Sequence, residues 1–185
     1  MNRFVLTCLL CMLPAAAHAD SLLQRAAGAV SSRWAETGGE RGKVDLYLPL
    51  YAWHNRSVYS PEERALLSER PLGLGVGGSA LTPEGSSHYS FYALAFRDSE
   101  GDVQPIAGYL QTWRMQSGGL FAGLGYTAFV TARRHFHRYL PFPGVLPVVE
   151  LGYGDFSLYA TYIPGGRTDG RRYGNIAFVM GRYAF

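Results

Sequence analysis

Cysteine is nearly absent from this chain, and both copies lie close to its start. Cys8 and Cys11 are the only ones in 185 residues. They fall in a segment with the marks of a secretory leader, namely a positive residue, an apolar stretch and a small-x-small cleavage pattern: Arg3, Phe4–Leu13 and Ala17-His18-Ala19. We therefore expect a leader over residues 1–19. The exported remainder then has no disulfide, thiol nucleophile or cysteine metal site.

The remainder also lacks a long apolar run and a strong net charge. No segment reaches the roughly 20 apolar residues that a spanning helix needs. The formal net charge is +3 for the whole chain, of which the leader contributes only Arg3, and it gives no indication of a nucleic-acid partner. Aromatic residues are abundant in the chain (13 Tyr, 10 Phe, 3 Trp), and there are 23 Gly; together they favour β structure. An exported chain of this kind is typical of an outer-membrane barrel, the alternative being a soluble periplasmic β protein.

The final segment, Ile176 to Phe185, is apolar on both faces along most of its length. One face turns polar only at Arg182, and the other carries small and aromatic residues throughout. A porin-type strand instead alternates lipid-facing apolar residues with water-facing polar ones. If the segment is a barrel strand, half of the barrel interior is apolar. Such an interior suits an acyl chain.

The pattern predicts an all-β fold: an eight-stranded antiparallel outer-membrane β-barrel over residues 44–185, preceded by an amphipathic helix over 20–36. The helix could lie flat in a membrane interface, or plug or flank the barrel base. Eight segments have about the ten residues that a tilted membrane strand needs. They are Val44–Val58, Pro71–Leu81, His88–Arg97, Gln104–Met115, Gly119–Arg133, Leu140–Gly152, Phe156–Pro164 and Tyr173–Phe185.

Connections between these segments alternate between short turns and longer or more charged loops, which sets the chain ends on the periplasmic side. With that orientation, three segments have a face that is apolar in its outer half and polar below. We expect this face to point inward and to form an acyl-chain pocket lined by Leu94, Phe96, Gly108, Leu110, Phe178 and Met180.

Four prolines lie in or beside these segments, although proline cannot donate to a strand ladder. They form two pairs on neighbouring strands: Pro49 with Pro71, and Pro147 with Pro164. Local gaps in the hydrogen-bonded wall are expected there, and gaps in a bilayer need compensation. Lateral entry of a lipid would be a functional reason, and simple strand termination is the alternative, mainly for Pro71 and Pro164.

Groups that could perform acyl transfer lie at the expected outer ends of two strands. His54 ends the first segment, and Asp98 with Ser99 follow the third. An imidazole, a carboxylate and a hydroxyl on one rim are the groups that acyl transfer uses. Solvated loop residues are the competing interpretation.

Several ordered segments resemble the lipid A palmitoyltransferase family, PagP, across nearly all of the exported chain. They are Asp45-Leu46-Tyr47-Leu48-Pro49, Trp53-His54, Glu69-Arg70-Pro71, Tyr92-Ala93-Leu94-Ala95-Phe96-Arg97-Asp98-Ser99, Pro105-Ile106-Ala107-Gly108-Tyr109, Val130-Thr131-Ala132-Arg133, Leu151-Gly152-Tyr153-Gly154 and Thr161-Tyr162-Ile163-Pro164-Gly165.

The resemblance implies an outer-membrane enzyme that moves an acyl chain, usually palmitate, from a glycerophospholipid to a hydroxyacyl chain of lipid A, without a cofactor or metal. The essential histidine, aspartate and serine of the family fall on His54, Asp98 and Ser99. Its lateral gates fall on the four prolines named above. We expect a monomer or weak homodimer whose partners are the two lipids.

Two roles stay open within this hypothesis. His54 is a general base or orients the attacking hydroxyl, with Asp98 holding or charging it. Ser99 is either a nucleophile or a donor to the developing oxyanion. One departure from the family concerns Leu110, where a glycine is common at the pocket floor. A filled pocket end predicts selection of a chain shorter than palmitate, unless neighbouring residues are smaller.

Other functions share some of these features. A non-catalytic structural or binding barrel needs neither an apolar upper interior nor prolines in its wall. A lipid A deacylase or phospholipase would use the same rim groups with water as acceptor. The pair His135 and His137 suggests a metal site only weakly, because no nearby carboxylate or cysteine completes it. A basic loop facing lipid A phosphates is the better interpretation.

Overall fold

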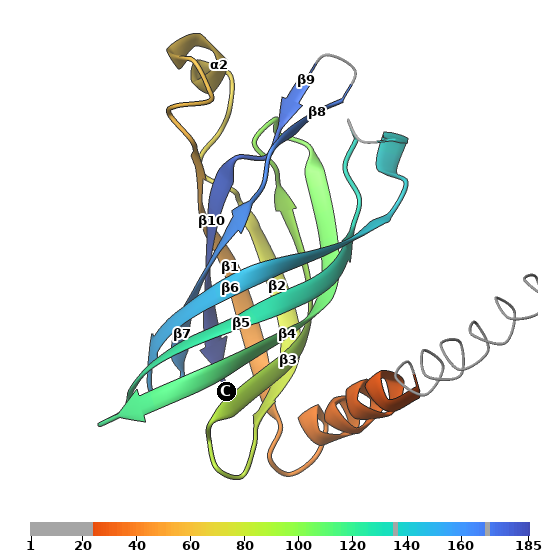
Figure 1. The fold of residues 1–185 in the computed structure, drawn as a ribbon, viewed down its shortest axis with the longest axis vertical. Coiled ribbons are helices and arrows are strands. Elements are labelled where there is room, and N and C mark those ends of the chain that lie inside the picture. Colours follow the sequence, from red (N-terminus) through yellow and green to blue (C-terminus); the bar gives the residue numbers. More distant parts are fainter. Residues whose placement is uncertain (1–23, 135–136, 169–170) are drawn as a thin grey trace, which may run out of the picture.

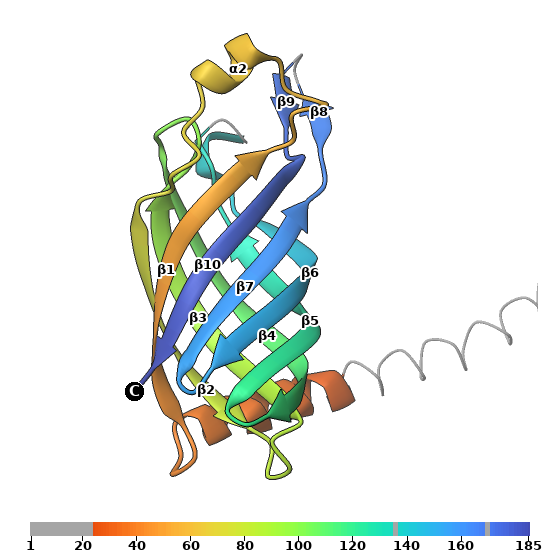
Figure 2. The same ribbon diagram turned by 90° about the vertical axis from the view of Figure 1, so that its left-hand side faces the viewer.

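A closed antiparallel β-barrel forms the body of the protein, as the sequence predicts (Figures 1 and 2). A computed structural model describes residues 24–134, 137–168 and 171–185. The strand order around the barrel is β1-β10-β7-β6-β5-β4-β3-β2. The strands are β1 (Lys43–His54), β2 (Gly73–Leu81), β3 (Ser87–Arg97), β4 (Val103–Ser117), β5 (Leu120–Thr131), β6 (Phe142–Tyr153), β7 (Phe156–Ile163) and β10 (Ile176–Ala184). Among the described residues, no helix combines the length and the apolarity needed to cross a membrane.

Small elements that the strand pattern did not predict stand above one end of the barrel, here called the rim (Figure 2). They are α2 (Pro61–Ala65), the hairpin β8 (Gly166–Thr168) with β9 (Arg171–Tyr173), and the short 3-10 turn His137–Tyr139. The last strand was predicted to begin at Tyr173, which is wrong. Gly174 and Asn175 have φ values of 72° and 51°, a left-handed pair that turns the chain and separates β9 from β10.

The outer wall of the barrel is apolar, because alternate strand residues point away from the interior. Side chains of this outward set are exposed aliphatic groups: Leu48, Leu74, Val76, Leu124, Val145, Val149 and Leu151. In water, so large an apolar surface would promote association. An apolar band around a closed barrel instead suits the hydrocarbon of a bilayer.

A helix over residues 24–37 lies across the outside of the other end, the base, near the C-terminus (Figures 1 and 2). Its Trp34 ring meets Phe91 of β3 edge to face, 4.9 Å between centroids. Arg33 donates to the Tyr109 hydroxyl, and Glu36 accepts from the Tyr89 hydroxyl. The helix therefore flanks the base and does not plug it. Residues 20–23 of the predicted helix, like the predicted leader, lie outside the described residues.

Charged side chains fill the lower half of the barrel interior. Arg114 on β4 donates through Nε to a Glu150 carboxylate oxygen on β6, at 2.8 Å. Arg182 on β10 pairs with Asp45 on β1, also at 2.8 Å. All four side chains are buried. We call them the polar layer. One pair joins the neighbouring strands β10 and β1, and the other joins β4 to β6 across β5. The polar layer separates the base from the space above.

We expect Glu150→Ala to destabilise the barrel strongly, because it leaves the buried Arg114 guanidinium without its carboxylate. Breaking one partner of a buried pair costs about 3–5 kcal/mol. Chemical unfolding of the refolded protein in detergent measures this loss. Glu84→Ala removes an exposed carboxylate from a base turn and serves as the control. An unfolding midpoint of Glu150→Ala equal to that of Glu84→Ala would contradict a stabilising role for the polar layer.

Candidate functional site

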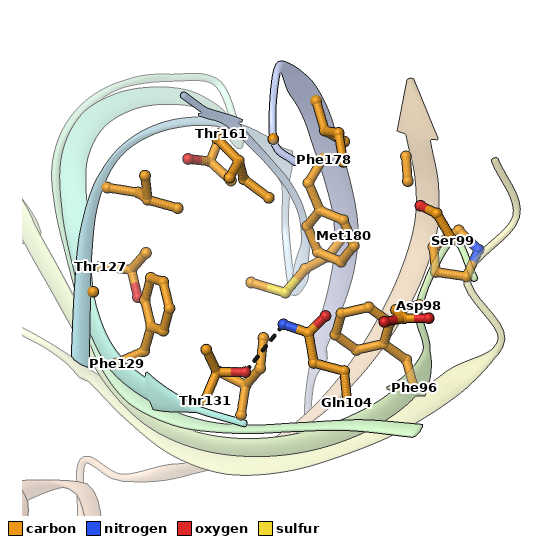
Figure 3. Close-up of a pocket in the computed structure, with 18 of the residues that line it drawn as sticks. Phe96, Asp98, Ser99, Gln104, Thr127, Phe129, Thr131, Thr161, Phe178 and Met180 are labelled. Carbon is orange, nitrogen blue, oxygen red and sulfur yellow. Dashed lines mark hydrogen bonds between the residues drawn. The ribbon is translucent and has the colours of Figure 1, made fainter. Parts of the chain in front are cut away.

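A cavity of about 610 Å³ occupies the upper half of the barrel, above the polar layer (Figure 3). Phe178 and Met180 project into it from β10, and Thr127 and Phe129 face them from β5 (Figure 3). The walls are mainly apolar. Five of the six predicted pocket residues line it: Leu94, Phe96, Leu110, Phe178 and Met180.

Leu110 forms the floor of the cavity. Its side chain is fully buried and packs in one apolar cluster with Tyr47, Tyr92 and Tyr159. Gly108, the sixth predicted residue, does not line the cavity. A Cβ at Gly108 would lie 2.9 Å from the Tyr92 hydroxyl, so the glycine leaves room for that tyrosine. Gly108 is therefore covered by Tyr92 and does not line the cavity.

The three predicted catalytic residues share the rim end of this cavity. His54 is the last residue of β1, and Asp98 and Ser99 follow β3 directly. All three line the cavity, and His54 is 1% exposed. Strand ends on one edge of a barrel bring residues distant in sequence together, which is why the sequence could predict their grouping. Within the described part of the chain, no hydrogen bond joins any two of them.

In the described chain, the partners of Asp98 are an arginine and its own loop, and His54 is not among them. Its carboxylate accepts from the Arg133 guanidinium at 3.0 and 3.2 Å. It also accepts from the backbone N–H groups of Glu100 and Asp102, each at 3.0 Å. Asp98 therefore closes the loop that carries Ser99 and fixes Arg133 at the cavity mouth. Sequence reasoning placed Arg133 in the basic outer loop but did not predict its contact with Asp98.

Among the described residues, the carboxylate at ion-pair distance from His54 belongs to Glu69, in the loop between α2 and β2. Glu69 Oε1 lies 3.6 Å from His54 Nδ1 and accepts from the His54 backbone N–H at 3.2 Å. Sequence reasoning gave this neighbour role to Asp98 and assigned none to Glu69. A long rim loop separates the two residues in sequence, so only the folded loop reveals the contact.

The barrel wall has two gaps, and the predicted prolines border them. Pairing between β1 and β2 ends at Tyr47 with Gly75, although β1 continues through Pro49 to His54. Pro71 precedes β2 on the other side of this gap.

The second gap lies between β6 and β7. Their pairing ends at Val149 with Ala160, below Pro147 and Pro164. The Thr161 hydroxyl donates to the Pro147 carbonyl at 2.7 Å, which satisfies one free acceptor there. Both gaps open beside the apolar cavity, since Ala52 and Pro71 line it at the first gap and Leu146 and Thr161 line it at the second.

The basic loop after β5 is only partly described. Arg134 pairs with Asp102 at 3.1 Å and remains largely exposed at the rim. His135 and the side chain of His137 lie outside what the structure describes, so the predicted phosphate-facing role of this loop stays a prediction.

Comparison with known proteins adds family information to this geometry. Residues 33–182 match the family model described as "Antimicrobial peptide resistance and lipid A acylation protein PagP". A curated Bordetella parapertussis protein named "Lipid A acyltransferase PagP" is 41% identical over 181 residues, covering 95% of this chain and 94% of its own. Proteins of the same name from Methylobacillus flagellatus and Cronobacter sakazakii are 38% and 44% identical, over 92% and 75% of this chain and 89% and 73% of theirs.

Proposed function

The chain belongs to the PagP family, and from that premise we propose that it transfers an acyl chain from a glycerophospholipid to a hydroxyacyl chain of lipid A in the outer membrane. The observation that carries this proposal is the apolar cavity with His54 at its mouth. An apolar cavity inside a closed wall is the environment in which a hydrocarbon tail loses contact with water. The tail would extend down to Leu110, with its ester at the rim.

The transfer needs a base and an acceptor but no redox step. The lipid A hydroxyl attacks the carbonyl carbon of the donor ester while the His54 imidazole accepts the hydroxyl proton. The bond from that carbon to the glycerol oxygen then breaks, and the proton passes from His54 to the departing lysophospholipid. The products are acylated lipid A and a lysophospholipid.

Ser99 fits best as a hydrogen-bond donor to the oxyanion of this reaction. A nucleophilic serine requires an adjacent base, and no hydrogen bond links Ser99 to His54 in the described chain. The Ser99 backbone carbonyl accepts from the Ser68 N–H at 2.8 Å, which fixes the residue between two rim loops. Asp98 supports the site through its contacts with Arg133 and the Ser99 loop.

Lipid access is best supported at the two wall gaps. Backbone groups facing hydrocarbon without partners cost several kcal/mol each, so a gap in a membrane barrel requires a function or a filler. Pro49 and Pro147 carry no N–H, which lowers the cost of leaving the ladder open at these positions. We assign the four prolines to lateral passage of the donor and acceptor chains.

The acceptor is supported by charge at the rim. Arg133 lines the cavity mouth and Arg134 stands exposed beside it. Guanidinium groups bind phosphate through paired hydrogen bonds. The phosphates of lipid A match this basic edge, which would hold the acceptor hydroxyl near His54.

Replacing His54 by phenylalanine should abolish transfer, because the ring shape remains while the proton acceptor is lost. General-base catalysis contributes about 10²–10⁴-fold to the rate. The assay incubates labelled phospholipid with purified lipid A and separates the products by chromatography. Heat-modifiable migration in electrophoresis checks that the barrel still folds. Transfer at the unmodified rate by a folded His54→Phe variant would remove His54 from the mechanism.

Leu110 should limit the length of the transferred chain. We expect the protein to select a chain shorter than palmitate and Leu110→Gly to shift selection toward longer chains, since removing the isobutyl group deepens the cavity. Mass spectrometry of modified lipid A measures the added mass. Leu124→Gly, on the outer wall, is the matched control and should leave the preference unchanged. Clean palmitoyl addition by the unmodified protein would refute this assignment.

A further inference from the structure

Glu69 accepts hydrogen bonds from four residues in and just after β1. Arg56 donates to both of its carboxylate oxygens, at 2.7 and 3.1 Å. The Tyr51 hydroxyl donates at 2.8 Å, and the His54 backbone N–H at 3.2 Å. The Glu69 backbone carbonyl also accepts from the Ala52 N–H at 3.0 Å. The loop is therefore fastened to β1 directly beside His54.

The Glu69 carboxylate stays ionised. Partial burial raises the pKa of the Glu69 carboxyl, but the hydrogen bonds from Arg56, Tyr51 and the His54 backbone outweigh burial and lower the pKa to about 2. Glu69 is thus ionised at any pH at which the protein would work. Its partners restrict its position, so the negative charge stays where the fold puts it.

The imidazole of His54 faces that charge with one edge. Nδ1 is buried, lies 3.6 Å from Glu69 Oε1 and has no hydrogen-bond partner among the described residues. The ring also packs edge to face on Tyr59, 5.2 Å between centroids, which limits its rotation. With Nδ1 directed at Glu69, Nε2 is the ring nitrogen available to the substrate. A carboxylate behind the ring fixes the tautomer and stabilises the protonated form.

The two aspartates of the rim loop after β3 have partners of their own. Asp98 is engaged by Arg133 and by two backbone N–H groups of its own loop. Asp102 pairs with Arg134. Glu69 differs from both, because its carboxylate lies at ion-pair distance from His54 Nδ1, a nitrogen without a hydrogen-bond partner in the described chain.

We propose that Glu69 is the positioning residue of His54: it orients the imidazole through Nδ1 and stabilises the imidazolium that forms when Nε2 takes the acceptor proton. This inference rests on the proposed transferase function for its kinetic consequence, but its electrostatic consequence is independent of any activity. The role of Glu69 follows neither from the grouping of His54, Asp98 and Ser99 at the rim nor from the lining of the cavity.

The test compares Glu69→Gln with the unmodified protein in detergent micelles. Glutamine keeps one oxygen, which can accept from either the His54 N–H or the Tyr51 hydroxyl, and it carries no charge. Nuclear magnetic resonance follows the His54 ring signal, assigned by its absence in His54→Phe, as pH is varied. We expect the ring to lose its proton about one pH unit lower or more in Glu69→Gln, since a neighbouring opposite charge shifts a titration by that amount.

The kinetic arm uses the same variant. We expect Glu69→Gln to lower kcat about 10-fold to 100-fold with little change in KM, because only the charge that grows on His54 during the step is affected. The acid limb of the pH–rate profile should move to lower pH together with the ring titration. Glu62→Gln, in α2 of the same loop, removes an exposed carboxylate without touching His54 and should change neither measurement.

The outcomes separate the two proposals. A shifted ring titration with no transfer by the unmodified protein would support Glu69 as the neighbour of His54 and reject the transferase function. Normal transfer with an unshifted titration and pH profile in Glu69→Gln would overturn the positioning role. If Glu69→Gln does not fold, Glu69→Asp withdraws the charge by one methylene and should give a smaller shift in the same direction. An unchanged titration in folded Glu69→Asp would likewise count against the proposal.

Discussion

The polar layer is the constraint on which the rest of the molecule depends. An eight-stranded barrel is narrow enough for side chains to fill it completely. Here two buried arginine–carboxylate pairs hold the walls together in the lower half. Their desolvation is costly and is offset only by good geometry and additional hydrogen bonds, such as the one from Arg182 to Ser79 at 2.6 Å. Because the lower half is closed in this way, the upper half can stay hollow and apolar, with Leu110 as the boundary.

The wall gaps and the rim loops solve a second problem, which is how lipids reach a cavity enclosed by a hydrogen-bonded wall. A closed ladder admits nothing sideways. Proline removes donors at two places on opposite sides of the barrel, and the rim loops bridge the open edges with a few specific contacts. Glu69 is one of them, since its backbone bonds to Ala52 above the gap while its side chain faces His54. The loop that carries Glu69 therefore borders both the wall gap proposed for lipid entry and the proposed catalytic histidine.

Much of this could be predicted from sequence, and the reason is the period of two in β-strands. The apolar face of Ile176, Phe178 and Met180 predicted the cavity. In the fourth segment the same alternation turned from apolar to polar after Leu110, while the floor position itself came from the family resemblance. His54, Asp98 and Ser99 were grouped correctly because strand ends share an edge. The rim was less accessible to this reasoning. Ser60 and Glu63 do form a readable capping box that begins α2, but the contact of Glu69 with His54 and the pairing of Asp98 with Arg133 depend on loop conformations that no periodicity encodes.

The central claim is that the upper half of the barrel holds the donor's hydrocarbon tail. The most direct measurement is a crystal structure with an ether-linked analogue of the glycerophospholipid donor, which cannot be cleaved. The account predicts one alkyl chain running from the rim to Leu110, between Phe178 and Phe129, with the ether oxygen beside His54. An analogue found only on the outer wall, with the cavity filled by water or by collapsed side chains, would contradict it.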